Sequence, residues 1–164
     1  MPNTLTISYL DYKDISGLES IVYGGMQFDG SYLMREALNA TGNAYAPYSH
    51  FSVGAALLLA DGTVVCGSNQ ENCAYPSGLC AERTALFAAS AQRPEVRDYV
   101  ALAIAARDAK GRQREAAPCG ACRQVMAEFE GLQGHPMRVM WTLEGGGVRM
   151  VERVADLLPF GFVL

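Results

Sequence analysis

Lysine is scarce in this sequence, and long apolar runs are missing. Only Lys13 and Lys110 are lysines, and thirteen basic against seventeen acidic residues give the 164-residue chain a net charge of -4. This balance argues against a basic groove for nucleic acid. No segment approaches the roughly 18 to 20 uninterrupted apolar residues of a membrane span, and the start of the chain lacks the charged leader of a secretory signal. We therefore expect a cytoplasmic protein that binds neither nucleic acid nor membranes.

Cysteine is the most informative residue type in the chain. The five cysteines are an odd number in a sequence without an export signal, so metal binding plus some free thiols explains them better than disulfides. Cys119 and Cys122 have the Cys-x-x-Cys spacing that lets two thiolates converge on one metal. Cys80 can supply a third sulfur from elsewhere in the fold. We therefore expect these three residues to bind zinc.

A zinc ion with three protein ligands keeps its fourth position for water, which is the catalytic arrangement. Such a water has a pKa near ~7 instead of ~15.7. A neighbouring carboxylate can take up its proton and pass it on, a role worth roughly 10²- to 10⁴-fold in rate. Glu82, two residues after Cys80, is the predicted proton carrier. This role requires Cys80 to lie in the turn just before regular helix begins.

Three thiolates give the zinc centre a formal charge of -1, which would weaken the metal as a Lewis acid. Two helices are expected to begin at the cysteines, so the positive ends of their dipoles can face the sulfurs. Arg83 is one helical turn from Cys80 and can donate hydrogen bonds to a thiolate, and Arg123 is a weaker candidate for the same role. We expect Arg83 to support metal binding.

The length and the pattern of apolar residues predict one α/β domain, a three-layer α/β/α sandwich with a mixed, mostly five-stranded sheet. Residues 1–28 are expected to be an N-terminal extension, with an alternating apolar segment at Leu5, Ile7 and Tyr9 and a weak helix within 14–25. The main domain is expected to span residues 29–164. Its predicted helices end at Gly42, before Pro94 and at Gly131, with one short closing helix at 154–158. Its predicted strands are 51–60, 63–66, 99–105, 139–143 and 148–151.

Four motifs together carry a family resemblance: the segment 45–56 (YAPYSHFSVGAA), Asn69-x-Glu71-Asn72, Cys80-Ala81-Glu82-Arg83 and Pro118-Cys119-x-x-Cys122. In this order they resemble the zinc-dependent cytidine deaminases that act on free nucleosides, over about residues 29 to 162. The resemblance implies a cytidine deaminase-like fold, a zinc cofactor and a homotetramer whose subunits share their active sites.

The resemblance also implies roles for individual residues. Glu82 matches the family's proton shuttle, and Cys80, Cys119 and Cys122 match its zinc ligands. The positions that match contacts to the nucleoside are Asn69 and Glu71 at the ribose 3'-hydroxyl, Phe51 beside the pyrimidine, the backbone of Ala81 at the base, Phe162 inserted from a neighbouring subunit, and Tyr48 and Tyr75 around the shared pocket.

The predicted function is the hydrolytic deamination of cytidine and deoxycytidine to uridine and deoxyuridine with release of ammonia. One alternative is a deaminase of another aminopyrimidine nucleoside or of a nucleoside antibiotic such as blasticidin S. A second alternative is not an enzyme but a protein with a closed structural zinc site, in which Cys66 or Cys73 supplies a fourth sulfur.

Overall fold

A mixed β-sheet forms the centre of the molecule. The computed structural model describes residues 7–163. Within that range the sheet has the strand order β1-β9-β8-β6-β4-β5, and β7 pairs with β6. β6 and β8 run parallel, whereas β4 is antiparallel to both of its neighbours. The strands are β1 (Leu10–Tyr12), β4 (Ser52–Leu59), β5 (Val64–Ser68), β6 (Tyr99–Arg107), β7 (Gln113–Arg114), β8 (Arg138–Thr142) and β9 (Val148–Val151).

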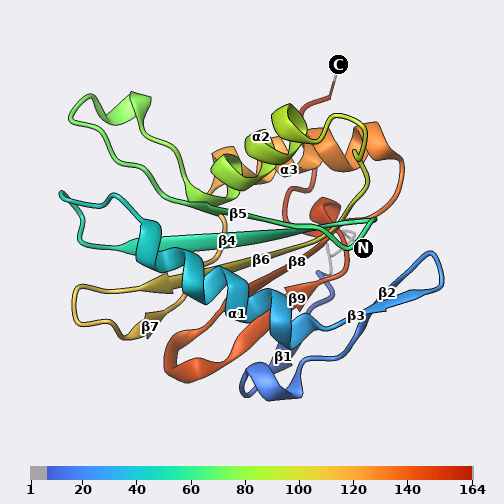
Figure 1. Cartoon of the computed structure of the whole chain (residues 1–164), viewed down its shortest axis with the longest axis horizontal. Coiled ribbons are helices and arrows are strands. Elements are labelled where there is room, and N and C mark those ends of the chain that lie inside the picture. The colour runs from blue at the N-terminus through green and yellow to red at the C-terminus, as the bar shows by residue number, and fades with distance from the viewer. Residues whose placement is uncertain (1–6, 164) are drawn as a thin grey trace, which may run out of the picture.

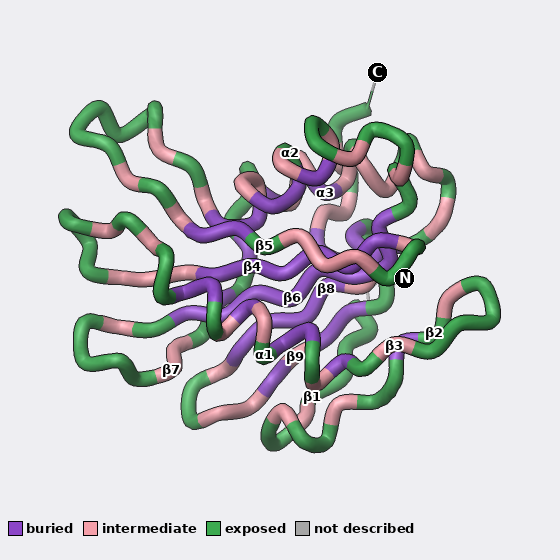
Figure 2. Tube along the Cα trace, in the orientation of Figure 1, coloured by how far each residue is buried: buried purple, intermediate pink, exposed green. Residues whose placement is uncertain are grey.

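Helices cover both faces of this sheet. α1 (Gly30–Ala40) lies on one face, and α2 (Ala81–Gln92) and α3 (Gly120–Gln133) lie on the other (Figure 1). Successive side chains of a strand point to opposite faces. Leu57 and Leu102 therefore pack beneath α2 and α3, while Ala56 and Ala103 pack beneath α1. The predicted three-layer α/β/α sandwich is confirmed, with its central strands buried on both sides (Figure 2).

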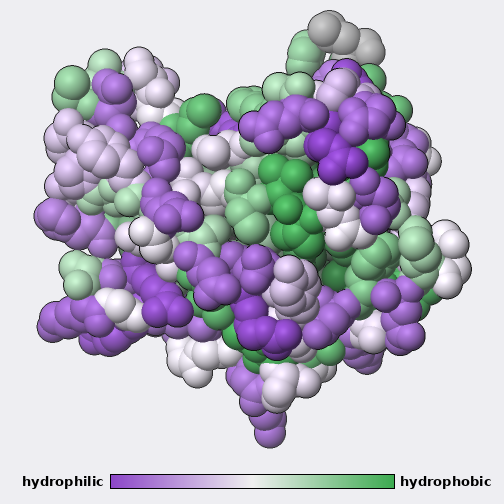
Figure 3. Space-filling view, in the orientation of Figure 1, coloured by the Kyte–Doolittle hydropathy of each residue, from purple (hydrophilic) through white to green (hydrophobic). Residues whose placement is uncertain are grey.

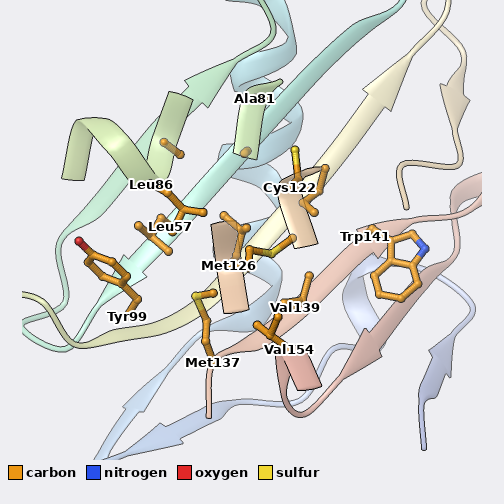
Figure 4. Close-up of a cluster of buried hydrophobic side chains, with 14 of the residues drawn as sticks. Leu57, Ala81, Leu86, Tyr99, Cys122, Met126, Met137, Val139, Trp141 and Val154 are labelled. Atoms are coloured by element: carbon orange, nitrogen blue, oxygen red, sulfur yellow. The ribbon is translucent and has the colours of Figure 1, made fainter. Parts of the chain in front are cut away.

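The apolar cluster beneath α2 and α3 reaches the predicted metal ligands. Cys122 is fully buried in this cluster together with Ala81 and Met126 (Figure 4). The first turn of each helix is therefore fixed by core packing. This matters for the site because Cys80 and Cys119 immediately precede these two helices.

Residues 14–25 do not form the expected weak helix. Only a single 3-10 turn forms at Ile15–Gly17, and a two-stranded sheet of β2 (Ile21–Tyr23) and β3 (Met26–Phe28) follows. Gly24 and Gly25 have φ of 55° and 79°, the left-handed values that a two-residue hairpin turn requires. The glycine pair therefore connects two strands and does not break a helix. Leu5 lies outside the described residues.

The extension also joins the main sheet. β1 pairs with β9, and Asp11 lies directly opposite Arg149. The Arg149 guanidinium donates to both oxygens of Asp11 at 2.7 and 2.8 Å and lies 4.4 Å from the centroid of the Tyr9 ring. These contacts lower the pKa of Asp11, chiefly through the hydrogen bond. The N-terminal segment thus closes one edge of the sheet.

Most of the other predicted elements are confirmed. The five predicted strands form β4, β5, β6, β8 and β9, and Asp29 caps α1 by accepting a 2.8 Å hydrogen bond from the amide of Ser31. The predicted closing helix is wrong, because Val154–Asp156 forms only a 3-10 turn. The short strand β7 is an element that the sequence pattern did not indicate.

Figure 3 shows the side chains on one face of the molecule. Hydrophilic side chains cover most of the face in Figure 3, and hydrophobic surface gathers near its centre. Among the described residues, no helix combines the length and the apolar character that crossing a membrane would need. Several aromatic side chains are exposed nevertheless, including Phe160 (99%), Tyr75 (76%) and Phe162 (68%).

Two glycines allow helices to lie directly against strands. A Cβ on Gly54 of β4 would lie 2.1 Å from the carbonyl oxygen of Ala37 in α1. A Cβ on Gly67 of β5 would lie 2.5 Å from the backbone nitrogen of Ala85 in α2. Both obstacles are backbone atoms of a packed helix, which cannot move aside easily. The layer spacing at these two points therefore depends on glycine.

Substitution of Gly54 by alanine should destabilise the fold strongly. The clash with the backbone of α1 should lower the free energy of unfolding by about 3 kcal/mol or more. Gly131→Ala is the matched control, because a Cβ there meets no atom within 4 Å and helix α3 should gain about 0.5–1 kcal/mol. Urea unfolding followed by circular dichroism measures both changes. Equal stability of the two variants would contradict this description of the layer contact.

Candidate active site

Three cysteine sulfurs converge where α2 and α3 begin. Cys80 is the N-cap of α2 and Cys119 is the N-cap of α3, and both have extended backbone conformations. Cys122 lies in the first turn of α3. The sulfur atoms of Cys80 and Cys119 are 3.9 Å apart, and those of Cys119 and Cys122 are 3.4 Å apart. The expectation that Cys80 precedes the regular helix is confirmed.

This spacing fits a tetrahedral zinc ion. Zinc binds thiolate sulfur at about 2.3 Å, so two ligands of one tetrahedron lie about 3.8 Å apart. All three sulfurs lie within 4.8 Å of one another. Among the cysteine, histidine, aspartate and glutamate side chains of the described residues, these three form the one group of at least three ligand atoms that is close enough to hold a metal. Cys66 and Cys73 lie outside the group, so neither supplies a fourth sulfur in this arrangement.

The surroundings of Cys80 favour its thiolate. Hydrogen bonds from Cys122, Arg83 and Cys119 lower the pKa of Cys80 to about 5, although partial burial opposes the shift. The Nη2 atom of Arg83 lies 3.5 Å from the Cys80 sulfur. Arg83 is therefore placed as the sequence suggested. Arg123 instead donates to the carbonyl oxygens of Pro118 and Leu157 at 2.8 and 3.1 Å, away from the thiols.

Glu82 provides a buried carboxyl beside the thiols. It lies in the first turn of α2 and is only 4% exposed. Burial raises its pKa to about 7, and Cys80 and Cys122 are close enough to influence that pKa as well. A carboxyl with a pKa near neutrality can both accept and release a proton at physiological pH, as general acid–base chemistry requires.

Cys80, Cys119 and Glu82 line a cavity of about 660 Å³. Aromatic side chains border it: Phe51 is half-buried at the start of β4, and the rings of Tyr48 and Tyr75 meet edge to face with centroids 6.0 Å apart. The cavity is lined by residues of the 48–53 segment, the 69–79 segment, the first turn of α2 and the 115–119 segment. Its volume suits a small molecule.

Asn69 and Glu71 lie in the same cavity, just after β5. The Asn69 carboxamide accepts from the amide of Val53 at 2.8 Å and donates to the carbonyl oxygen of Phe51 at 2.9 Å. The Glu71 carboxylate accepts from the amide of Tyr48 at 2.9 Å. Both side chains therefore hold the 48–53 segment in place while they face the cavity.

Three residues of the expected site lie outside the cavity lining, and Cys122 is one of them although its sulfur belongs to the converging group. Ala81 is fully buried at the start of α2. Phe162 is largely exposed, and its carbonyl oxygen accepts a 2.8 Å hydrogen bond from Gln124 of α3. The structure therefore brings together the three cysteines, Glu82, Arg83, Phe51, Asn69, Glu71, Tyr48 and Tyr75, but not Ala81 or Phe162.

Some lining residues had no role assigned from the sequence. These are Ser49, Val53, Gln70, Asn72, Gly78, Leu79, Glu115, Ala116 and Ala117. Ser49 belongs to the segment that carries the family resemblance, but no local pattern connects it with Glu71. That connection depends on the fold, which places residues 22 positions apart next to each other.

Replacement of Arg83 by alanine should weaken zinc binding. Loss of the hydrogen bond to Cys80 removes a partner of a metal ligand, which typically costs about 10- to 100-fold in metal affinity. Competition with a chromogenic chelator measures this affinity. Arg35→Ala, at an exposed ion pair with Asp29 on α1, is the control and should leave zinc affinity unchanged. Unchanged affinity in Arg83→Ala would remove this role from the arginine.

Known proteins are similar to this chain in both sequence and fold. The sequence model of the cytidine and deoxycytidylate deaminase zinc-binding region matches residues 28–133. The cytidine deaminase of Sporosarcina psychrophila is 52% identical over 134 residues, which cover 82% of this chain and 91% of that protein. That of Halalkalibacterium halodurans is 54% identical over 101 residues, which cover 62% and 72%.

Solved structures agree with these relatives. The crystal structure of cytidine deaminase from Burkholderia pseudomallei has a TM-score of 0.69 and 44% identity, covering 80% of this chain and 97% of that one. The cytidine deaminase from Mycobacterium tuberculosis has a TM-score of 0.62 and 36% identity, covering 83% and 98%. With its three converging thiols and buried glutamate, this chain belongs to the cytidine and deoxycytidylate deaminases, a family of zinc enzymes.

Proposed function

We propose that this protein hydrolyses the 4-amino group of cytidine and deoxycytidine, giving uridine or deoxyuridine and ammonia. The observation that carries the proposal is the placement of the buried Glu82 carboxyl beside three thiols that fit zinc, inside a cavity of nucleoside size. The names of the relatives support the same substrate class, since several are cytidine deaminases at up to 54% identity.

The proposed mechanism assigns a separate role to each of a few side chains. Cys80, Cys119 and Cys122 hold the zinc, which when bound supplies a water of lowered pKa beside the pyrimidine. Glu82 takes a proton from the attacking water and delivers it to N3 of the ring. After N3 is protonated, the Glu82 carboxylate takes the second proton from the oxygen added at C4 and passes it to the 4-amino group, which leaves as ammonia. The Glu82 pKa of about 7 suits a group that must accept and donate in turn.

Substrate binding is proposed to use the rest of the cavity. Phe51 packs beside the pyrimidine, whereas Ala81 is fully buried outside the cavity lining and is not assigned a contact to the base. Asn69 and Glu71 bind the ribose 3'-hydroxyl. The hydrogen bonds that already hold Asn69 and Glu71 against the 48–53 segment support this assignment, because they fix both side chains before a ligand arrives.

The proposed assembly is a homotetramer in which Phe162 enters the active site of a neighbouring subunit. Its large exposed fraction of 68% supports this, as does the exposure of Tyr48 and Tyr75 at the cavity rim. The proposed catalytic domain spans residues 29–164, with residues 1–28 as an extension. A cytoplasmic location fits three metal-binding thiols, which a reducing compartment keeps available.

The reaction is tested by an ultraviolet assay with cytidine, deoxycytidine, cytosine, CMP and blasticidin S. Cytidine and deoxycytidine should be deaminated. Glu82→Gln keeps the shape of the side chain but cannot carry a proton, so kcat should fall by at least about 10²- to 10⁴-fold. Zinc content of the variant, measured by mass spectrometry, should equal that of the wild type. Turnover of none of the five compounds, or full activity in Glu82→Gln, would refute the proposal.

Shared active sites make activity depend on concentration. On dilution below the dissociation constant of the oligomer, activity per chain should fall in parallel with the loss of tetramer seen by light scattering.

Phe162→Ala should lower kcat/KM by about tenfold or more, since it removes an aromatic contact to the substrate pocket. Val163→Ala, also at an exposed position, is the control. A fully active monomer would rule out the shared site.

A further inference from the structure

The hydroxyl of Ser49 contacts the carboxylate that is proposed to bind ribose. Ser49 Oγ donates to Glu71 Oε1, and the amides of Tyr48 and Ser49 both donate to Oε2, at 2.9 and 3.3 Å. Ser49 and Glu71 both line the cavity. The carboxylate is therefore held by three donors of one short segment.

These donors leave little freedom to the carboxylate. An ionised carboxylate has about four acceptor positions. Both positions of Oε2 are filled by backbone amides, and one position of Oε1 is filled by the Ser49 hydroxyl. About one position remains, on Oε1, for a donor that enters the cavity. The hydrogen bonds also lower the pKa of Glu71, with the Ser49 hydroxyl as the largest cause, so the group stays an acceptor.

Ser49 has a second contact that fixes its own position. Its Oγ accepts a 3.1 Å hydrogen bond from the amide of Phe51. Between Ser49 and Phe51, His50 has φ of 54°, a left-handed value that a non-glycine residue adopts at some cost. The serine hydroxyl thus bridges this strained turn and the carboxylate. It couples the position of Phe51 to the direction of the free lone pair on Glu71.

We propose that Ser49 is a positioning residue for nucleoside binding: its hydroxyl orients Glu71 so that the remaining acceptor position of Oε1 receives the ribose 3'-hydroxyl. The proposal rests on the function proposed above, since that function brings a ribose into the cavity. Ser49 acts through Glu71 and touches neither the base nor the metal ligands. Its effect should therefore depend on whether the ligand has a 3'-hydroxyl.

The test compares the affinities of cytidine and 3'-deoxycytidine by calorimetric titration. Zinc-loaded Glu82→Gln protein serves as the background, because its kcat should be lower by about 10²- to 10⁴-fold and little ligand is then converted during the titration. Adding Ser49→Ala should weaken cytidine binding by about five- to tenfold, the loss expected for one hydrogen bond to a charged group at a partly exposed site. The affinity for 3'-deoxycytidine should change by less than twofold. Equal losses for the two ligands, or no loss for either, would overturn the proposal.

Three further variants separate positioning from general damage. Ser49→Thr keeps a hydroxyl and should restore most of the affinity for cytidine. In Glu71→Gln protein, Ser49→Ala should cause no further ligand-dependent loss, since the two residues act as one unit. Ser16→Ala removes a similar serine–carboxylate hydrogen bond, to Asp14 in the N-terminal extension, and should leave both affinities unchanged. Ser49→Ala could instead cause as large a ligand-dependent loss in the Glu71→Gln protein as in the protein that keeps Glu71. That result would contradict the proposal that Ser49 acts through Glu71.

The two proposals can fail separately. Absence of cytidine turnover in the wild type refutes the proposed function. Normal turnover with an unchanged ratio of the two affinities in Ser49→Ala refutes only the role of Ser49.

Discussion

The convergence of three thiols at two helix starts is the constraint on which the rest of the site depends. Cys80 and Cys119 have extended conformations as N-caps, so their side chains turn toward one point while the helices begin beyond them. Cys122 is fixed by the same core that buries Ala81 and Met126. Because backbone amides at a helix start carry partial positive charge, both helices also stabilise thiolates at this point. The metal site is thus a product of core packing.

The parts of the molecule that the sequence predicted well are local. The Cys-x-x-Cys spacing and the apolar runs of β4 and β6 each lie within a few residues, and the structure contains all of them. The hairpin of the extension was missed although its signal is local, because Gly24-Gly25 was interpreted as the end of a helix when it forms a turn.

Contacts between distant segments were beyond the reach of sequence patterns. Asp11 and Arg149 are 138 positions apart, and each alone is an ordinary surface charge. Ser49 and Glu71 are also far apart in the sequence, and their hydrogen bond depends on the pairing of β4 with β5.

Arg123 shows the opposite kind of error, in which side chains that are close in the sequence do not form the expected hydrogen bond. Its proximity to the cysteines in sequence suggested a thiolate partner, but its side chain turns to the carbonyl oxygens of Pro118 and Leu157.

The close contact at Gly67 has a consequence for ligand selection. It presses the first turns of α2 onto β5, and β5 leads directly into Asn69 and Glu71. One backbone contact therefore helps to set the separation between the thiol end of the cavity and the end that holds Asn69 and Glu71. Under the proposed function, this separation would select ligands by the length from the ring amine to the sugar hydroxyl.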